Sequence, residues 1–174
     1  DSPVSGGAKG AVAGTLAIMA GGDDVDIERV RPIVEAFSQR FTRMGESGAG
    51  QVTKLCNQII VASNVVTMAE AISFAEKSGV VDATKLAEAL KGGWADSQPF
   101  QIMAPRFAAR NTDPVIGHAN TMLKDLDTAR DVAMENGAPL PMASLASEAF
   151  RKLSSMGLGE KDIGEIMTLF DPME

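Results

Sequence analysis

Several residue types on which stability and chemistry often depend are scarce in this sequence. Its 174 residues include one cysteine, one histidine and one tryptophan, and no tyrosine. The lone cysteine, Cys56, excludes an internal disulfide bond, and together with His118 it supplies too few ligands for a zinc site. We therefore expect no metal site, and we expect Cys56 to be a buried, unreactive thiol on an apolar helix face.

Positive charge is also scarce. Lysine and arginine total 16 against 23 aspartate and glutamate residues, which gives a formal net charge of −7. Because a nucleic-acid surface needs a basic face, we expect no nucleic-acid partner. Polar residues at Asn57, Asn64 and Glu70 interrupt the most apolar stretch, so we expect no membrane span. With no signal-peptide pattern, these features favour a cytoplasmic location.

The first part of the chain has the pattern of an α/β fold. The predicted elements are a strand at 1–4, a loop at 5–10, a strand at 15–20, a helix and an edge strand at 41–44. The helix is predicted to begin within 23–26 and to end near 39. Because the chain opens at Asp1 without an initiator methionine, we expect it to be the later part of a longer protein. The beginning of this α/β domain would then be missing.

From Gly48 onward the pattern predicts only helices. The first, from about 50 to 78, would be about 45 Å long. Apolar side chains cover most of its circumference, so it should be surrounded by protein, and so short a chain can hardly cover it alone. We therefore expect a homodimer or homotetramer. Shorter helices are predicted at 82–90, 98–110, 118–136, 141–156 and 161–170.

The fold class is therefore mainly α. Residues 1–46 are the end of an α/β domain, and residues 47–174 form an all-helical domain built on one long helix. Trp94 and Phe100 are expected to pack in the core of the helical domain rather than to line a substrate pocket.

A polar stripe marks the start of the long helix. A glycine-rich turn at 45–50 leads into it, and four polar side chains fall within about a third of its circumference: Gln51, Lys54, Asn57 and Gln58. A lysine beside amides on an otherwise apolar helix indicates either a structural contact or a proton-transfer site. The residues alone leave both interpretations open.

Four motifs in order carry a family resemblance. They are DSPVSGG at 1–7, GTLAIMAGG at 14–22, GAGQVTKLCN at 48–57 and KDL at 124–126. Together they resemble the β-hydroxyacid dehydrogenase family, which includes 3-hydroxyisobutyrate dehydrogenase and 2-hydroxy-3-oxopropionate reductase. The resemblance implies a Rossmann domain, of which 1–46 is the C-terminal part, followed by an all-helical domain for substrate binding and dimerisation. The nucleotide fingerprint G-x-G-x-x-G would precede Asp1. The glycines at 6–10 do not form it, because their spacing is wrong and we expect a short strand to follow them.

The resemblance also implies an activity. The protein would be an NAD(P)-dependent oxidoreductase that interconverts a β-hydroxyacid and its semialdehyde by hydride transfer, with NAD or NADP as cofactor. Lys54 resembles the catalytic lysine of the family, which acts as the general acid/base. A lysine in water, with a pKa near ~10.4, is a poor base at neutral pH, but burial can lower that value. An ordinary surface lysine is the alternative.

Other roles follow from the same resemblance. Asn57 is expected to contact the substrate, and the turn at Ser5, Gly6 and Gly7 is expected to bind its carboxylate. Lys124 is expected to contact the cofactor, with Asp125 orienting it or capping a neighbour. The alternatives are structural: an amide that joins two helices, a plain turn, and a solvated charged face. Where the family often has a bulky aromatic residue before the KDL motif, this chain has Gly117, which leaves the identity of the hydroxyacid open.

Two other functions are consistent with these motifs. The chain could be a non-catalytic oligomerisation or scaffold relative, or a different enzyme on the same fold, such as an imine reductase or a 6-phosphogluconate dehydrogenase. Lys54 together with Asn57 favours a hydroxyacid enzyme. Because the main cofactor motif is absent, we expect this chain by itself to be inactive.

Overall fold

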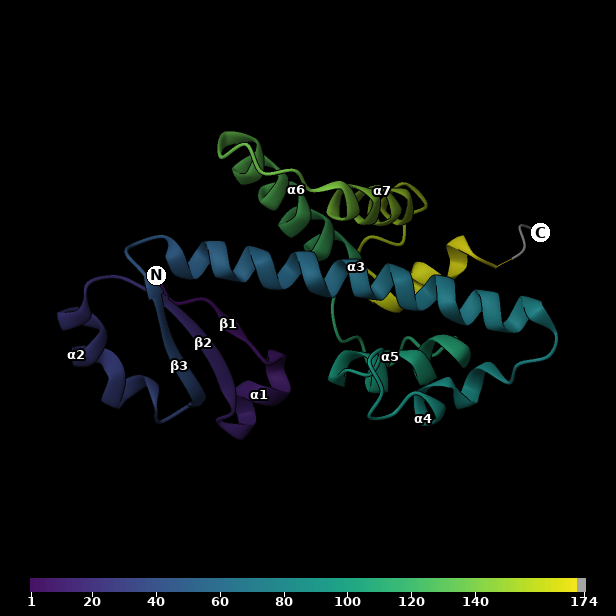
Figure 1. Ribbon diagram of the computed structural model, residues 1–174, viewed down its shortest axis with the longest axis horizontal. Coiled ribbons are helices and arrows are strands. Elements are labelled where there is room, and N and C mark those ends of the chain that lie inside the picture. Colours follow the sequence, from purple (N-terminus) through teal and green to yellow (C-terminus); the bar gives the residue numbers. More distant parts are fainter. Residues whose placement is uncertain (172–174) are drawn as a thin grey trace. The chain divides into compact units, whose positions relative to one another are not determined.

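The computed structural model describes residues 1–171, in two compact units, Asp1–Asn57 and the chain from Gln58 onward. In chain order the elements are β1 (Val4–Ser5), α1 (Gly7–Ala13), β2 (Leu16–Gly21), α2 (Asp24–Val34), β3 (Ser38–Gly45), α3 (Ala49–Ser78), the 3₁₀ segment η1 (Ala83–Lys85), α4 (Leu86–Ala89), α5 (Gln98–Ala108), α6 (Ala119–Glu135), α7 (Pro141–Ser155) and the 3₁₀ segment η2 (Ile163–Leu169) (Figure 1). The division between the units falls within α3, after Asn57, and the domain boundary at 46/47 stays a prediction.

The first unit is built on a three-stranded sheet in the order β1-β2-β3. β1 pairs antiparallel with β2, and β2 pairs parallel with β3. Alternate residues of β2, namely Leu16, Ile18 and Ala20, are buried, as expected for a strand that packs one face on the interior. The strands predicted at 15–20 and 41–44 are confirmed, whereas the first strand covers Val4–Ser5 rather than 1–4. The helix before β3 ends at Val34 rather than near 39. The residues after it turn the chain into β3, which pairs with β2.

Residues 5–10 do not form the predicted loop, and a helix rather than a short strand follows Ser5. α1 begins at Gly7, directly after β1. Its sequence, GAKGAVA, contains glycines, which lower helix propensity. The sequence pattern therefore did not predict this helix. Positive φ angles at Gly6 (128°) and Gly14 (67°) mark its two ends.

The start of α3 lies directly against the sheet. The backbone N–H groups of Gly48 and Gln51 donate hydrogen bonds of 2.7 Å to the two carboxylate oxygens of Asp1. At Gly50 an added Cβ would lie 2.5 Å from the carbonyl oxygen of Met19 and 2.7 Å from Oδ2 of Asp1. Only glycine therefore allows this close approach, which explains the glycine-rich motif before the helix.

The second unit is entirely helical around the rest of α3. Figure 1 shows α6 and α7 on one side of α3 and α4 and α5 on the other. The largest fully buried side chains of the chain include Ile72, Phe107, Leu126, Phe150, Leu153 and Ile166, all of which lie in this core. Phe100 is also buried, as predicted, but Trp94 is fully exposed, with a relative exposure of 107%, so its expected core position is wrong. The expected fold class is confirmed.

The last predicted helix is a 3₁₀ segment, η2, and its start is fixed by the buried Asp162. The carboxylate of Asp162 accepts hydrogen bonds from the backbone N–H groups of Gly164 (2.9 Å) and Ile116 (2.6 Å). Arg106 lies 3.5 Å from the same carboxylate. These contacts compensate the buried charge and join α5, the start of α6 and η2.

α3 is not fully surrounded within one chain. Ile60 and Phe74 are 61% and 78% exposed, and Cys56 is exposed rather than buried as predicted. α3 also passes a test for a membrane span by length and composition alone, which corrects our expectation that no stretch does so. A core helix passes the same test, and 39% of the most apolar window of α3 is buried.

Replacing Gly50 with alanine should destabilise the first unit, because the new methyl group would overlap backbone and carboxylate atoms that cannot easily move. We expect a loss of about 1–3 kcal/mol, measured by urea unfolding. The matched control is Gln51→Ala, since the Gln51 side chain is exposed and only its backbone N–H is used. Equal stability of the two variants would contradict the close approach of α3 to β2.

Candidate functional site

Ser5, Gly6 and Gly7 lie at a sharp strand-to-helix turn. Ser5 ends β1 and pairs with Ala17 of β2, Gly6 precedes α1, and Gly7 is the first residue of α1. At Gly7, which is exposed and has a φ of 60°, an added Cβ would meet nothing within 4 Å. The turn therefore leaves open space beside its backbone, with a hydroxyl-bearing residue next to it.

Lys54 and Asn57 lie near the start of α3, and both are half-buried. They belong to the same compact unit as the turn at Ser5. Helical spacing keeps Lys54, Asn57 and Gln58 on one side of α3, as predicted. Direct contact of Lys54 and Asn57 with a substrate stays a prediction.

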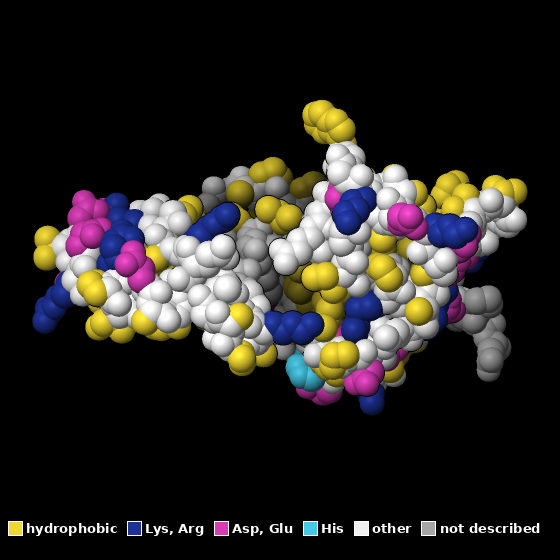
Figure 2. All heavy atoms as spheres, turned by 90° about the horizontal axis from the view of Figure 1, so that it is seen from below, with side chains coloured by type: hydrophobic (Ala, Val, Ile, Leu, Met, Phe, Trp, Pro, Cys, Tyr) yellow, Lys and Arg dark blue, Asp and Glu magenta, His cyan; other side chains and the backbone are white. Residues whose placement is uncertain are grey.

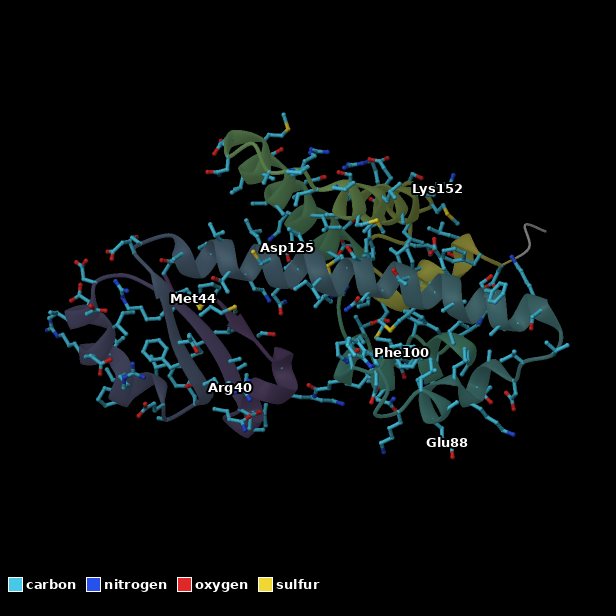
Figure 3. The ribbon with its side chains drawn as sticks, in the orientation of Figure 1. Arg40, Met44, Glu88, Phe100, Asp125 and Lys152 are labelled. Carbon is cyan, nitrogen blue, oxygen red and sulfur yellow. The ribbon has the colours of Figure 1, made fainter. Side chains whose placement is uncertain are left out.

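Lys124 lies on α6, and a chain of polar contacts joins it to α3. Its Nζ atom is 3.0 Å from Oδ1 of Asp125, so the two side chains are paired, and the orienting role expected for Asp125 stays a prediction. The other carboxylate oxygen, Oδ2, accepts a hydrogen bond of 2.7 Å from Nε2 of Gln58. Figure 3 shows Asp125 on the side of α6 that faces α3.

The two members of the ion pair differ in exposure. The Lys124 side chain is 72% exposed, whereas that of Asp125 is 18% exposed. A carboxylate that is bound on both oxygens can fix an ammonium group while leaving its remaining N–H groups available to a ligand. Lys124 can therefore donate hydrogen bonds to hydroxyl or carbonyl oxygens of a bound molecule.

Sequence reasoning placed Gln58 on the polar stripe but did not find its contact with Asp125. The helical spacing that grouped it with Lys54 and Asn57 was the available signal.

His118, in contrast, has a structural role, because its Nδ1 lies 2.9 Å from the carbonyl oxygen of Glu160. Across residues 1–171 no group of three or more potential ligands could hold a metal ion.

The helical unit also carries an open apolar groove of about 630 Å³. Its lining comes from α3, α4, the segment before α5 and the start of α5, and includes Met68, Phe74, Leu86, Leu90, Trp94 and Phe100. Figure 2, which shows the molecule from below, has hydrophobic side chains at the surface among charged ones where α4 and α5 lie. Such exposed apolar surface is typical of an interaction site.

Two family models match the chain. Residues 48–170 match a model described as NAD-binding of NADP-dependent 3-hydroxyisobutyrate dehydrogenase. Residues 1–45 match the NAD binding domain of 6-phosphogluconate dehydrogenase. Both models describe NAD-binding domains, which confirms the expected NAD(P) cofactor class.

Individual relatives are similar over nearly the whole chain. The NAD-dependent L-serine dehydrogenase of Pseudomonas aeruginosa is 34% identical over 100% of this chain and 60% of the relative. The 2-hydroxy-3-oxopropionate reductase of Escherichia coli is 36% identical over 99% of this chain and 59% of the relative. A solved structure of 3-hydroxyisobutyrate dehydrogenase from Mycobacterium tuberculosis with L-serine has a TM-score of 0.88 and 31% identity, over 99% of this chain and 60% of that one. The chain thus spans about 60% of the length of these relatives.

Alanine substitutions at Gly6 and Ser5 should have very different effects on the free energy of unfolding. An alanine at position 6 would need a φ of 128° and would place its Cβ 3.2 Å from Cδ2 of Leu16. We expect Gly6→Ala to cost about 1–3 kcal/mol in urea unfolding, because L residues rarely adopt this conformation. Ser5→Ala, the control next to it, should change the unfolding free energy much less. A stable Gly6→Ala variant would show that the turn does not need its glycine.

Proposed function

The chain belongs to the β-hydroxyacid dehydrogenase family, and from this premise we propose that it is part of an NAD(P)-dependent oxidoreductase that interconverts a β-hydroxyacid and its semialdehyde. The observation that carries the proposal is the polar side of α3. There Lys54 and Asn57 are followed by Gln58, and Gln58 bonds to Asp125, the carboxylate that holds Lys124.

Lys54 is proposed as the general acid/base. When the hydroxyacid is oxidised, the hydroxyl proton passes to the neutral amine of Lys54 and the carbon–hydrogen bond breaks with loss of a hydride. In the reverse direction the ammonium group returns the proton to the carbonyl oxygen. NAD(P), when bound, supplies or accepts the hydride. The position of Lys54 beside Asn57 on the polar side of α3 supports this role.

The substrate is proposed to bind through its carboxylate at Ser5, Gly6 and Gly7 and through its oxygen atoms at Asn57. The open space beside Gly7 fits this role, since a ligand can approach the backbone there. The relatives and the ligand of the solved structure name substrates with a shared skeleton. L-Serine and 3-hydroxyisobutyrate both carry a hydroxymethyl group on the carbon next to the carboxylate. We propose the same class, 3-hydroxyacids, for this protein.

Lys124 is proposed to contact NAD or NADP. The residues present fit the part of the cofactor that carries hydroxyl and amide oxygens, because the ammonium group is exposed and held by Asp125. The fingerprint G-x-G-x-x-G does not occur in these residues, and we expect this chain alone to bind the cofactor weakly and to be inactive.

We further propose that a second copy covers the exposed face of α3, as a homodimer or homotetramer. Cys56, Ile60, Thr67 and Phe74 are exposed and fall on one face at helical spacing. The apolar groove continues this face through Phe74 and Trp94. This assignment accounts for the apolar composition of α3 without a membrane, and with the acidic net charge it favours a cytoplasmic protein without a nucleic-acid partner. A scaffold relative would share this surface, and Lys54 distinguishes the two functions.

Lys54→Ala in the full-length protein should lower kcat for 3-hydroxyacids about 100-fold or more, because the proton acceptor is lost. Lys54→Arg should lose as much, since a guanidinium keeps the charge but does not release a proton at neutral pH. The measurement is the initial rate of NAD(P)H formation over a panel of 3-hydroxyacids.

The matched control is Lys152→Ala, because Lys152 is an exposed lysine near the end of α7 (Figure 3). It should leave the rate unchanged. If Lys54→Ala keeps the wild-type kcat, the acid/base assignment is wrong and the scaffold alternative gains support.

Charged residues on the exposed face of α3 should dissociate the oligomer. We expect Ile60→Lys with Phe74→Lys to sediment as a monomer, because two ammonium groups cannot be buried in an apolar contact. Cys56, on the same face, should react faster with a thiol reagent in this variant than in the wild type. The control is Val25→Lys, at a 79% exposed apolar residue on α2. A wild-type protein that is a monomer at every concentration would refute the proposal.

A further inference from the structure

We infer that Gln58 is a positioning residue for the cofactor-binding lysine: its amide holds the Asp125 carboxylate in the orientation that fixes the ammonium group of Lys124. The inference rests on the proposed role of Lys124. It adds to that role a residue on α3 that acts through the Asp125 carboxylate.

Gln58, Asp125 and Lys124 form a short chain of contacts, which we call the relay. Nε2 of Gln58 donates to Oδ2 of Asp125 at 2.7 Å, and Oδ1 of Asp125 lies 3.0 Å from Nζ of Lys124. The sulfur of Met122, one turn before Asp125 on the same face of α6, lies 3.9 Å from the same Nε2 atom, so the amide contacts a second residue of α6. Because both oxygens of Asp125 are engaged, rotation of this carboxylate would break at least one contact.

Exposure increases along the relay. Gln58 is half-buried, the Asp125 side chain is 18% exposed and the Lys124 side chain is 72% exposed. A lysine with such an exposed ammonium group samples many rotamers unless something fixes its end. A surface ion pair alone contributes little to holding such a side chain. The amide of Gln58 supplies the missing restraint, because it fixes the carboxylate to which the ammonium is paired.

The position of Gln58 on α3 gives the relay its significance. Gln58 follows Asn57 directly and comes about one turn after Lys54. The same helix therefore carries the proposed proton-transfer group and the residue that orients the cofactor contact. Losing the amide should weaken cofactor binding while leaving the proton-transfer group in place.

A purely structural tie between α3 and α6 is the alternative, and a second amide in the helical unit separates the two. Nε2 of Gln101 donates to Oδ1 of Asp96 at 2.6 Å and to the carbonyl oxygen of Ala87 at 2.8 Å. This is the same kind of amide–carboxylate bond, but no proposed site residue takes part in it. Gln101→Leu is therefore a matched control for the loss of such a bond.

The experiment uses the full-length protein and two readouts. Calorimetry gives the Kd of NAD and of NADP without substrate, and initial rates give the KM for cofactor, the KM for 3-hydroxyacid and kcat. For Gln58→Leu we expect Kd and cofactor KM to rise about tenfold or more, as for a lost hydrogen bond to a charged group. Changes in kcat and hydroxyacid KM should be much smaller. Gln101→Leu should leave Kd unchanged even where it lowers the melting temperature.

If Gln58→Leu folds poorly, a second pair of substitutions, Gln58→Glu and Asp125→Asn, tests the same contact. Gln58→Glu alone places two carboxylates together and should weaken cofactor binding. Combined with Asp125→Asn, it restores an amide–carboxylate bond with the donor and acceptor exchanged and leaves an amide oxygen to accept from Lys124. We expect the double variant to bind cofactor more tightly than Gln58→Glu alone.

The outcomes separate this inference from the proposed function. If the wild type binds cofactor but oxidises no hydroxyacid, and Gln58→Leu still weakens binding, the relay stands and the proposed reaction is wrong. If Gln58→Leu leaves the cofactor Kd unchanged, or the wild type binds neither NAD nor NADP, the relay has no role in positioning and the inference is overturned.

Discussion

The contact between the start of α3 and the sheet is the constraint on which the first unit depends. Gly50 brings the helix against the carbonyl oxygen of Met19, and the carboxylate of Asp1 accepts hydrogen bonds from the first turn. A carboxylate at a helix N-terminus both satisfies unpaired N–H groups and interacts favourably with the helix dipole. Lys54 and Asn57 follow within about two turns, so their placement depends directly on this contact.

The elements with a periodic sequence pattern could be predicted, because the spacing of apolar residues follows which side chains are buried. The apolar run of β2 and the length of α3 were both evident, and the KDL motif predicted the Lys124–Asp125 pair. α1 was missed because a helix rich in glycine and alanine has no apolar period. The predictions for Trp94 and Cys56 were wrong because an apolar side chain suggests burial without showing which residues cover it. In this chain, none of the described residues covers either side chain.

The bond between Gln58 and Asp125 joins residues 67 positions apart, so no local pattern could reveal it. Helical spacing placed Gln58 beside Lys54 and Asn57 but could not identify what it contacts. The family resemblance supplied roles for Lys54 and Lys124, and the structure supplied the carboxylate and amide that hold one of them. The proposed substrate class rests on the names of the relatives, since the open space at Gly7 does not indicate a particular substrate.

The cap on α3 comes from Asp1, whose backbone also pairs with Gly21 at the end of β2: the Asp1 carbonyl oxygen accepts from the Gly21 N–H at 2.8 Å. Asp1 therefore contributes both to the pairing of the first residues with β2 and to the entry of α3. If β1 slipped by one position along β2, the carboxylate would leave the helix and Ser5 would move to the opposite face of the strand.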